Sequence, residues 1–343
     1  MTAVLNGTRK QATTPDVTDI DRAINSRRST IRRRLTIIGI AVVVVSVFFI
    51  TYDALDAWAI IGPLRLSRLA ALILVAVALS VATAVFQAVT RNRILSPSVM
   101  GFDSMFQLMA TASIFFFGSA VIGQVPNSIV FLINAALMTL VAVSLFLVVL
   151  RRGRSNVYLL VLVGIVVGTF FRSLTSLLST VMDPGEYLAV ADASTASFAV
   201  INTEALGVAT VLAILALAYI WKRSPQWDIL ALGPDLARGL GLRYRKEVRL
   251  ALTASTVLVA SATALVGPLM FFGLLIVNIA VYAGGSNRLR DLLLASSGIG
   301  IVVLVGGQAI LEHVLNQATI LPVILELVGG LLLLIMILRG TRR

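Results

Sequence analysis

The sequence contains no cysteine, a single histidine (His313) and few charged residues. The absence of cysteine excludes disulfide bonds, thiolate metal sites and thiol redox chemistry. Charged residues make up 13% of the 343 residues, about half the share found in an average soluble domain. The chain also lacks a G-x-x-x-x-G-K-S/T motif, so it does not hydrolyse ATP through a P-loop. Without an H-E-x-x-H motif or a recognisable Ser/His/Asp set, we expect that the chain is not an enzyme and carries no metal.

Hydrophobic residues, by contrast, make up 58% of the chain, and the mean hydropathy is +0.98. The net charge of +12 could indicate a nucleic-acid partner. The basic residues, however, cluster at the ends of apolar segments, which is how membrane topology is specified. We therefore expect an all-α polytopic membrane protein that contacts lipid and binds no nucleic acid.

The apolar segments define about ten candidate spans, because a helix needs about 20 residues to cross a bilayer. The candidates are Leu35–Tyr52, Leu66–Val89, Val99–Phe117, Asn127–Leu150, Val157–Val181, Ala196–Trp221, Val248–Val266, Leu269–Ala283, Leu292–Val314 and Pro322–Leu338. The eighth is short and follows Gly267-Pro268, which favours a separate half-helix. Residues 1–34 form a polar N-terminal tail, and residues 35–343 form the transmembrane domain.

The loop charges test this count. If the N-terminus is cytoplasmic, the tail, the inner loops and the C-terminus hold nearly all of the 28 Lys and Arg residues. The exceptions are Arg65, Arg68 and Arg172. Such a bias predicts ten spans with both termini in the cytoplasm.

The largest inner loop is a polar island, residues 221–249, that lies between two long apolar segments. Asp228 is placed to cap a first short helix. Gly233 then breaks the chain, Pro234 suits the first turn of a second short helix, and Gly241 is placed to end it.

Leu236 and Leu240 lie four residues apart and so share one face of this second helix. The polar island is therefore either an ordinary basic loop or a docking element for a soluble partner.

Ionisable and amide side chains inside spans are candidates for the translocation pathway, because burying them in a bilayer is costly. Arg172 and Glu204 could line a polar surface or form a structural ion pair between neighbouring helices. Glu326 could line a vestibule or lie at the outer interface. Asn202 is a further candidate, and Asn278 is either a ligand or an interhelical hydrogen-bond partner.

Two basic residues, Arg65 and Arg68, open the second span at the predicted outer surface, against the inside bias. They could be snorkelling anchors. Two cations three residues apart could equally receive carboxylates from an external protein. Glu312 and His313 fall at the outer end of the ninth span, where a wetted helix end is the simpler interpretation.

Several stretches, in order along most of the chain, resemble one family of membrane proteins. Arg65–Arg68 resembles R-L-P-R, Arg91–Gly101 resembles R-N-P-L-A-x-P-x-x-L-G, Ala231–Leu242 resembles a coupling loop, Gly267–Leu274 resembles G-P-I-x-F-V-G-L, and Leu321-Pro322 falls at the family's E-L-P. These are motifs of the FecCD-type permeases of iron-siderophore, haem and vitamin B12 ABC importers. Val277-Asn278 replaces the family's P-H, Ile320 replaces an acid and Arg93 replaces a proline. These departures resemble the ferric-siderophore branch.

The resemblance implies a permease subunit in the bacterial cytoplasmic membrane that works by alternating access. Its implied partners are a second permease (a non-identical homologue or a copy of this chain), two ATPase subunits that carry ATP and Mg, and an external substrate-binding protein. It implies that the coupling loop, about residues 222–247, contacts the ATPase. The candidate contacts are Leu232, Gly233, Pro234, Leu236, Ala237, Arg238, Leu240, Gly241 and Arg243. Arg65 and Arg68 match family arginines that meet acids of the binding protein.

Two alternatives to a ferric-siderophore importer stay open. The first is a haem or cobalamin importer of the same family, which a cargo assay distinguishes. The second is an ion-driven secondary transporter, which needs no ATPase.

Overall fold

The computed structural model describes residues 17–52, 58–151, 157–286, 288–313 and 320–340, and these residues form helices and connecting loops without a β-strand. A 3-10 turn covers Pro97–Met100. The helices are α1 (Val17–Thr51), α2 (Trp58–Thr90), α3 (Phe102–Phe117), α4 (Ser119–Ile122), α5 (Asn127–Arg151), α6 (Val157–Val181), α7 (Pro184–Ser194), α8 (Thr203–Leu230), α9 (Pro234–Gly239), α10 (Tyr244–Val266), α11 (Phe272–Gly284), α12 (Leu289–His313) and α13 (Leu321–Gly340).

Seven of the described helices are long and apolar enough to cross a membrane, as judged by length and composition. Three shorter apolar helices accompany them: Phe102–Phe117, Phe272–Gly284 and Leu321–Ile335. Each candidate span of the sequence overlaps one of these helices. The chain is thus an all-helical, multi-pass membrane protein, and the expected half-helix after Gly267-Pro268 is the separate helix α11.

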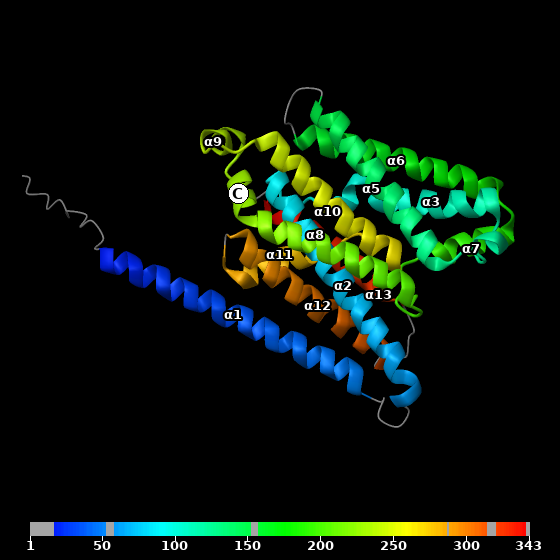
Figure 1. The fold of residues 1–343 in the computed structure, drawn as a ribbon, viewed down its shortest axis with the longest axis horizontal. Coiled ribbons are helices and arrows are strands. Elements are labelled where there is room, and N and C mark those ends of the chain that lie inside the picture. The colour runs from blue at the N-terminus through cyan, green and yellow to red at the C-terminus, as the bar shows by residue number, and fades with distance from the viewer. Residues whose placement is uncertain (1–16, 53–57, 152–156, 287, 314–319, 341–343) are drawn as a thin grey trace, which may run out of the picture.

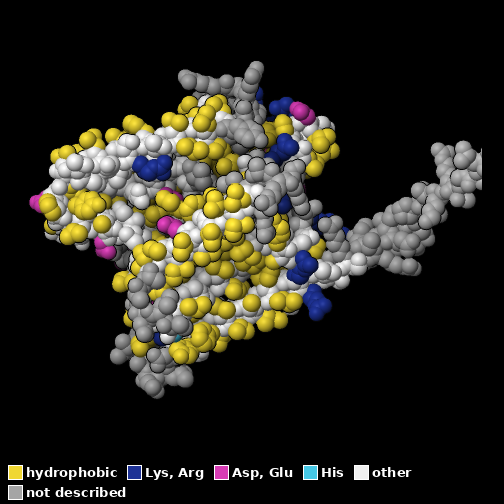
Figure 2. Space-filling view, turned by 180° about the vertical axis from the view of Figure 1, so that it is seen from behind, with side chains coloured by type: hydrophobic (Ala, Val, Ile, Leu, Met, Phe, Trp, Pro, Cys, Tyr) yellow, Lys and Arg dark blue, Asp and Glu magenta, His cyan; other side chains and the backbone are white. Residues whose placement is uncertain are grey.

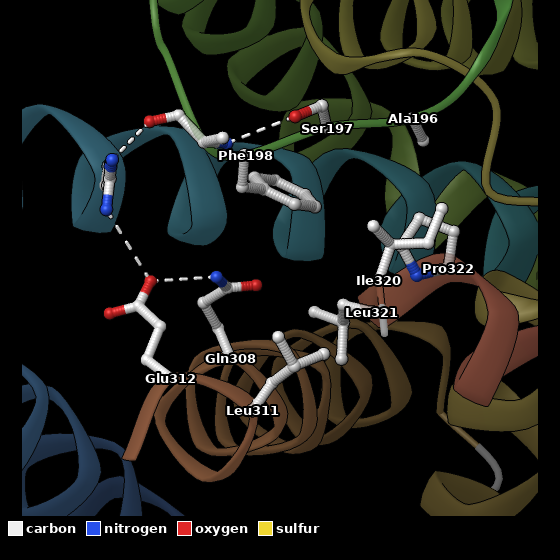
Figure 3. Close-up of a pocket in the computed structure, with 11 residues that line it drawn as sticks. Ala196, Ser197, Phe198, Gln308, Leu311, Glu312, Ile320, Leu321 and Pro322 are labelled. Carbon is white, nitrogen blue, oxygen red and sulfur yellow. Dashed lines mark hydrogen bonds and ion pairs between the residues drawn. The ribbon is translucent and has the colours of Figure 1, made fainter. Parts of the chain in front are cut away.

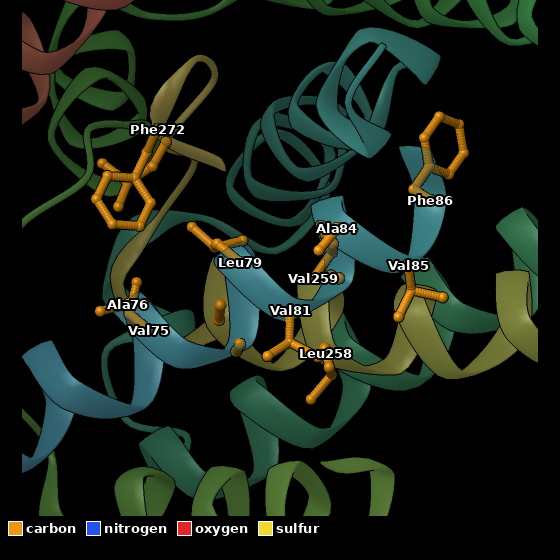
Figure 4. Packing of buried hydrophobic residues seen from close by; sticks show 14 of the residues in the cluster. Val75, Ala76, Leu79, Val81, Ala84, Val85, Phe86, Leu258, Val259 and Phe272 are labelled. Atoms are coloured by element: carbon orange, nitrogen blue, oxygen red, sulfur yellow. The ribbon is translucent and has the colours of Figure 1, made fainter. Parts of the chain in front are cut away.

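Helix α2 forms the centre of the bundle, and α8, α10, α11 and α12 pack around it (Figure 1). Its buried face is rich in small residues, including Ala76 and Ala82, which are fully buried. Glycines on the neighbouring helices allow close approach, since a Cβ added at Gly300 of α12 would lie 2.6 Å from Ser80 Oγ. Figure 4 shows the apolar side chains of α2 between those of α10 and α11. The core therefore depends on close helix packing.

Helix α1 lies along the outside of the bundle against α12, while α3, α5, α6 and α7 form a second group at the other side (Figure 1). Figure 2 shows that most visible Lys and Arg side chains gather toward the end that carries α9, whereas acidic side chains are prominent at the opposite end near α7. On the face that Figure 2 shows, basic side chains thus lie mainly toward the α9 end.

Three helix starts differ most from the predicted boundaries. α1 begins at Val17, within the predicted polar tail, of which residues 1–16 lie outside the described residues. α2 begins at Trp58, eight residues before the predicted Leu66.

The predicted start of the sixth span at Ala196 is also wrong, because α8 begins only at Thr203. The Asn202 side chain caps this helix by accepting a hydrogen bond from the backbone N–H of Ala205 at 2.9 Å. The preceding loop pairs with the end of α10 instead, where the Ser197 N–H donates to the Val266 carbonyl at 2.8 Å. Glu204 therefore lies in the first turn of α8.

Candidate functional site

The polar island begins as a continuation of α8, which runs on from its apolar part to Leu230. We call residues 221–230 the α8 extension. Pro225 lies inside it and cannot donate to the carbonyl of Trp221. That carbonyl instead accepts from Ser224 Oγ at 2.8 Å and from Arg290 Nη2 at 3.4 Å. These replacement donors explain why the helix continues through the proline.

The prediction that Asp228 caps a short helix of its own is wrong. Its Oδ1 atom accepts from the backbone N–H of Leu289 at 2.6 Å, so Asp228 caps the first turn of α12. A carboxylate at a helix N-terminus satisfies a free N–H group and complements the helix dipole. Asp228 thereby ties the α8 extension to α12.

A second contact between the α8 extension and α12 comes from Arg290. Its Nε atom donates to Ser224 Oγ at 3.0 Å. Its guanidinium also lies 5.3 Å from the centre of the Trp221 ring, within the range of a cation–π contact. The extension is therefore held to α12 at two successive turns.

The extension is also fixed to α10, by Glu247, a carboxylate that is only 6% exposed. Its Oε2 atom accepts from Nε1 of the fully buried Trp227 at 3.1 Å, and its Oε1 atom pairs with Arg223 at 3.3 Å. A buried indole N–H needs such an acceptor. We call Arg223, Trp227 and Glu247 the α8–α10 clamp.

Helix α9 projects from the end of the α8 extension (Figure 1). The chain turns at Gly233, whose φ of 104° favours glycine, and Pro234 opens the helix. Gly241, with a φ of 81°, follows the helix end. The Leu242 N–H then donates to the Ala237 carbonyl at 2.9 Å. The predicted second short helix and its punctuation are confirmed.

The apolar side chains of α9 divide between its two faces. Ala237 is fully buried against the bundle, whereas Leu236 and Leu240 are 61% and 64% exposed. Leu232 in the preceding turn is 54% exposed. Beside them lies a concave basic surface of about 600 Å³ whose lining includes Arg238 and Arg243. α9 thus presents apolar side chains beside positive charge.

Sequence reasoning missed a contact between α2 and this turn. Arg91, just after α2, has a φ of 53° and is the only non-glycine residue with a positive φ in the described part of the chain. Its guanidinium reaches Gly233, since a Cβ added there would lie 3.1 Å from Arg91 Nη1. A side chain at position 233 would displace the end of the Arg91 side chain slightly, and the φ of 104° is the stronger reason for glycine here.

The hypothesis of an Arg172–Glu204 ion pair is wrong for the structure as described. Arg172 donates to Ser104 Oγ at 3.1 Å and to Thr169 Oγ1 at 3.2 Å. Glu204 accepts from Ser128 Oγ at 3.0 Å. Each charge has its own polar partner, Arg172 on α3 and α6 and Glu204 on α5.

The other translocation candidates lie in different surroundings. Asn278 is 3% exposed, and its Nδ2 atom donates to the carbonyls of Leu274 and Arg93 at 2.8 and 3.3 Å. It therefore fastens α11 to the loop after α2. Glu326 is exposed on α13. Asp103 was missed by sequence reasoning: it is 2% exposed on α3, and neither carboxylate oxygen has a hydrogen-bond partner in the described structure.

Arg65 faces the end of α1. Its Nη1 atom donates to the carbonyls of Phe49 and Tyr52, the former at 3.2 Å. A cation at this position complements the negative end of a helix dipole. Arg65 therefore joins the start of α2 to the end of α1.

Arg68 lies one turn further along α2, beside a cavity of about 150 Å³ (Figure 3). Its Nη2 atom donates to the Ala199 carbonyl, and its Nη1 atom lies 3.6 Å from Oε1 of Glu312 on α12. The same Glu312 oxygen accepts from Gln308 Nε2 at 2.8 Å. The two arginines that sequence analysis grouped together thus have separate internal partners.

Comparisons with known proteins agree with the sequence and the fold. Residues 34–339 match the FecCD transport family. The chain is 38% identical over 306 residues to the petrobactin import system permease protein YclO of Bacillus subtilis (strain 168), an alignment that covers 89% of this chain and 96% of the relative. It is 28% identical to the petrobactin import system permease protein FatC of Bacillus anthracis, with 80% of this chain and 78% of the relative covered.

A solved inward-facing structure, described as an ABC transporter of metal-chelate type, has a similar fold. The TM-score is 0.77 at 20% sequence identity, and the match covers 90% of this chain and 99% of the other. The family match spans almost the entire described bundle, including α9 and both arginines at the start of α2. The chain therefore belongs to the FecCD transport family.

Proposed function

We propose that this chain is the transmembrane permease subunit of an ATP-driven importer that moves a ferric-siderophore complex across the bacterial cytoplasmic membrane. The observation that carries the proposal is the 38% identity to a petrobactin permease over nearly the full length of both chains. Petrobactin is the cargo named for that relative, and the cargo class is transferred here as a proposal. Transport proceeds by alternating access, and this subunit performs no covalent chemistry.

The chain crosses the membrane ten times, and both termini are cytoplasmic. Support comes from the seven long and three shorter apolar helices. The length of helix α12 gives the distance between the two ends of the bundle. The helix begins at Leu289, which Asp228 of the polar island caps, and reaches Glu312 after 23 residues. At 1.5 Å per residue these ends lie about 35 Å apart, which exceeds a hydrocarbon core of about 30 Å. The polar island and Arg68 therefore lie on opposite sides of the membrane.

The polar island couples the permease to an ATPase partner that binds ATP and Mg. Leu236 and Leu240 enter an apolar groove on the ATPase, and Arg238 and Arg243 lie at the rim of that groove. The large exposed fractions of both leucines support this role. The remaining proposed contacts are Leu232, Gly233, Pro234, Ala237 and Gly241.

The contacts of the α8 extension with α10 and α12 explain how a force on α9 reaches the bundle. The α8 extension continues α8 without a break to Leu230, and a short turn at residues 231–233 joins it to α9. Asp228 and Arg290 fix the extension to α12, and Glu247 fixes it to α10. A displacement of α9 is therefore transmitted to three membrane helices together.

The assembled importer contains a second permease, two ATPase subunits and an external binding protein. The second permease is a non-identical homologue or a copy of this chain. The binding protein docks at the end that carries Arg65 and Arg68. Arg172, Asn202, Glu204, Asn278 and Glu326 stay candidates for the translocation pathway. The local bonds of Asn202 and Asn278 favour structural roles for those two amides.

Affinity purification of the tagged chain from native membranes, followed by iron-chelate uptake in proteoliposomes, tests the proposal. We expect an ATPase to co-purify and uptake of ferric petrobactin to be ATP-dependent and vanadate-sensitive. Haem and cobalamin serve as competing cargoes, and transport of either one in place of the ferric siderophore would contradict the cargo assignment. Uptake that persists without an ATPase would contradict the ABC mechanism.

A further inference from the structure

Arg68 lies at the end of the bundle opposite the polar island, where an external partner has access. Its side chain is 29% exposed and lines the cavity of about 150 Å³ together with Gln308 and Glu312 (Figure 3). The same Glu312 oxygen contacts both Arg68 and Gln308, and dashed lines in Figure 3 mark these interactions. The guanidinium that could receive an external carboxylate thus already faces a carboxylate of its own chain.

The contact between Arg68 and Glu312 is weak enough for another carboxylate to replace Glu312. The closest distance between the two groups is 3.6 Å, which is long for a charge-assisted hydrogen bond. The side chain of Arg68 is 29% exposed and that of Glu312 is 10% exposed, so water screens the pair from the arginine side. Such one-sided screening keeps the net contribution of the pair small. Arg68 keeps its bond to the Ala199 carbonyl if Glu312 leaves. Its position is therefore maintained without the ion pair.

Glu312 likewise has a second partner. Its Oε1 atom accepts from Gln308 Nε2 at 2.8 Å, and both residues lie on α12, four positions apart. The carboxylate can keep this bond while releasing the arginine. Each member of the ion pair thus keeps one hydrogen bond when the two separate, and the released carboxylate still borders the cavity of about 150 Å³.

We propose that Glu312 is an intramolecular competitor that occupies Arg68 until an acidic side chain of the external binding protein displaces it. The proposal rests on the proposed function, because it requires a binding protein that docks at Arg68. Glu312 makes empty-state docking weaker than the arginine alone would allow. The exchange of one carboxylate for another also keeps the arginine paired in both states, which selects against partners that lack an acid at this point.

The decisive variant is Glu312→Gln, which removes the charge and keeps the size of the side chain and an oxygen that can accept from Gln308. The probe is the binding protein that co-purifies with the importer, and its affinity is measured by biolayer interferometry on the complete importer in nanodiscs. We expect roughly two- to fivefold tighter binding, the scale of one partly exposed ion pair. Asp192→Asn is the matched control: it removes an exposed acid at the same end without touching Arg68. It should leave the affinity near the wild-type value.

The combination with Arg68→Gln separates competition from positioning. Arg68→Gln alone should weaken binding, and Glu312→Gln should give no gain in that background. Weaker binding in Glu312→Gln alone would overturn the competition and show that the carboxylate positions the arginine. Unchanged binding in Arg68→Gln would contradict docking at Arg68 itself and leave the family assignment and the ATPase contact untouched. Recovery of the ATPase with each purified variant checks that the importer is folded and assembled.

Discussion

Removing the carboxylate of the α8–α10 clamp should loosen the coupling element while leaving the membrane helices in place. In Glu247→Ala, the Trp227 indole N–H loses its acceptor in a site where Trp227 is fully buried. A buried donor without a partner costs about 1–3 kcal/mol. Arg223, whose side chain is 30% exposed, regains water and adds little to this cost. The equilibrium ratio between molecules whose α8 extension is bound to α10 and molecules whose extension is detached should therefore fall roughly 5- to 150-fold.

Glu247→Gln provides the matched control for this change. The amide oxygen can still accept from Trp227 Nε1, so only the ion pair with Arg223 is lost. We expect a smaller change than in Glu247→Ala, because Arg223, whose side chain is 30% exposed, regains water when the ion pair is lost. The indole bond and not the charge should therefore account for most of the effect.

The assay is trypsin cleavage of the polar island in inside-out vesicles stripped of ATPase, together with the amount of cargo moved per ATP hydrolysed in the intact importer. Glu247→Ala should be cleaved faster and should move less cargo per ATP, and Glu247→Gln should stay close to the wild type. Equal behaviour of the two variants in both assays would refute the role assigned to the Trp227 hydrogen bond.

Three further changes test other parts of the account. Asp228→Ala should lower the thermal stability of the purified permease by about 0.5–2 kcal/mol, since α12 loses its N-cap, and an unchanged melting temperature would contradict this. Gly300→Leu should reduce the folded yield in membranes, because even a Cβ there would lie 2.6 Å from Ser80 Oγ, and normal yield would contradict the close packing of α2 and α12. Exchanging Arg172 and Glu204 should not rescue uptake relative to the single charge losses, since each group has a separate partner, and a rescue would restore the ion-pair hypothesis.

The spans were predictable because membrane helices need long apolar segments, and such segments make up most of the chain after the polar tail. The start and end of α9 were predictable for a local reason, because Pro234 and Gly241 act through their own backbone conformations. Both features depend on residues close together in the sequence. The identity of the spans and of the second short helix therefore needed no three-dimensional information.

The partners of the island were not predictable in the same way. Asp228 was expected to cap a short helix of its own. Its Oδ1 atom instead accepts from the backbone N–H of Leu289, which lies 61 residues later. The chain pattern offers no sign of this, since an acid before an apolar stretch suits a local cap equally well. The start of α8 was misplaced for a related reason: residues 196–201 are mostly apolar, yet Ser197 pairs with the end of α10. Tertiary hydrogen bonds decided both cases.

The central claim is that the apolar face of α9 binds an ATPase, and the absence of cysteine allows a direct test. Leu236→Cys introduces the only thiol, and labelling with a membrane-impermeant maleimide in inside-out vesicles reports its accessibility. Ser29→Cys, at an exposed position on α1, is the control. We predict that ATP-binding partner subunits protect Cys at position 236 from labelling, that stripping them restores labelling, and that position 29 is labelled equally in both states. Equal labelling of position 236 with and without the ATPase would contradict the claim.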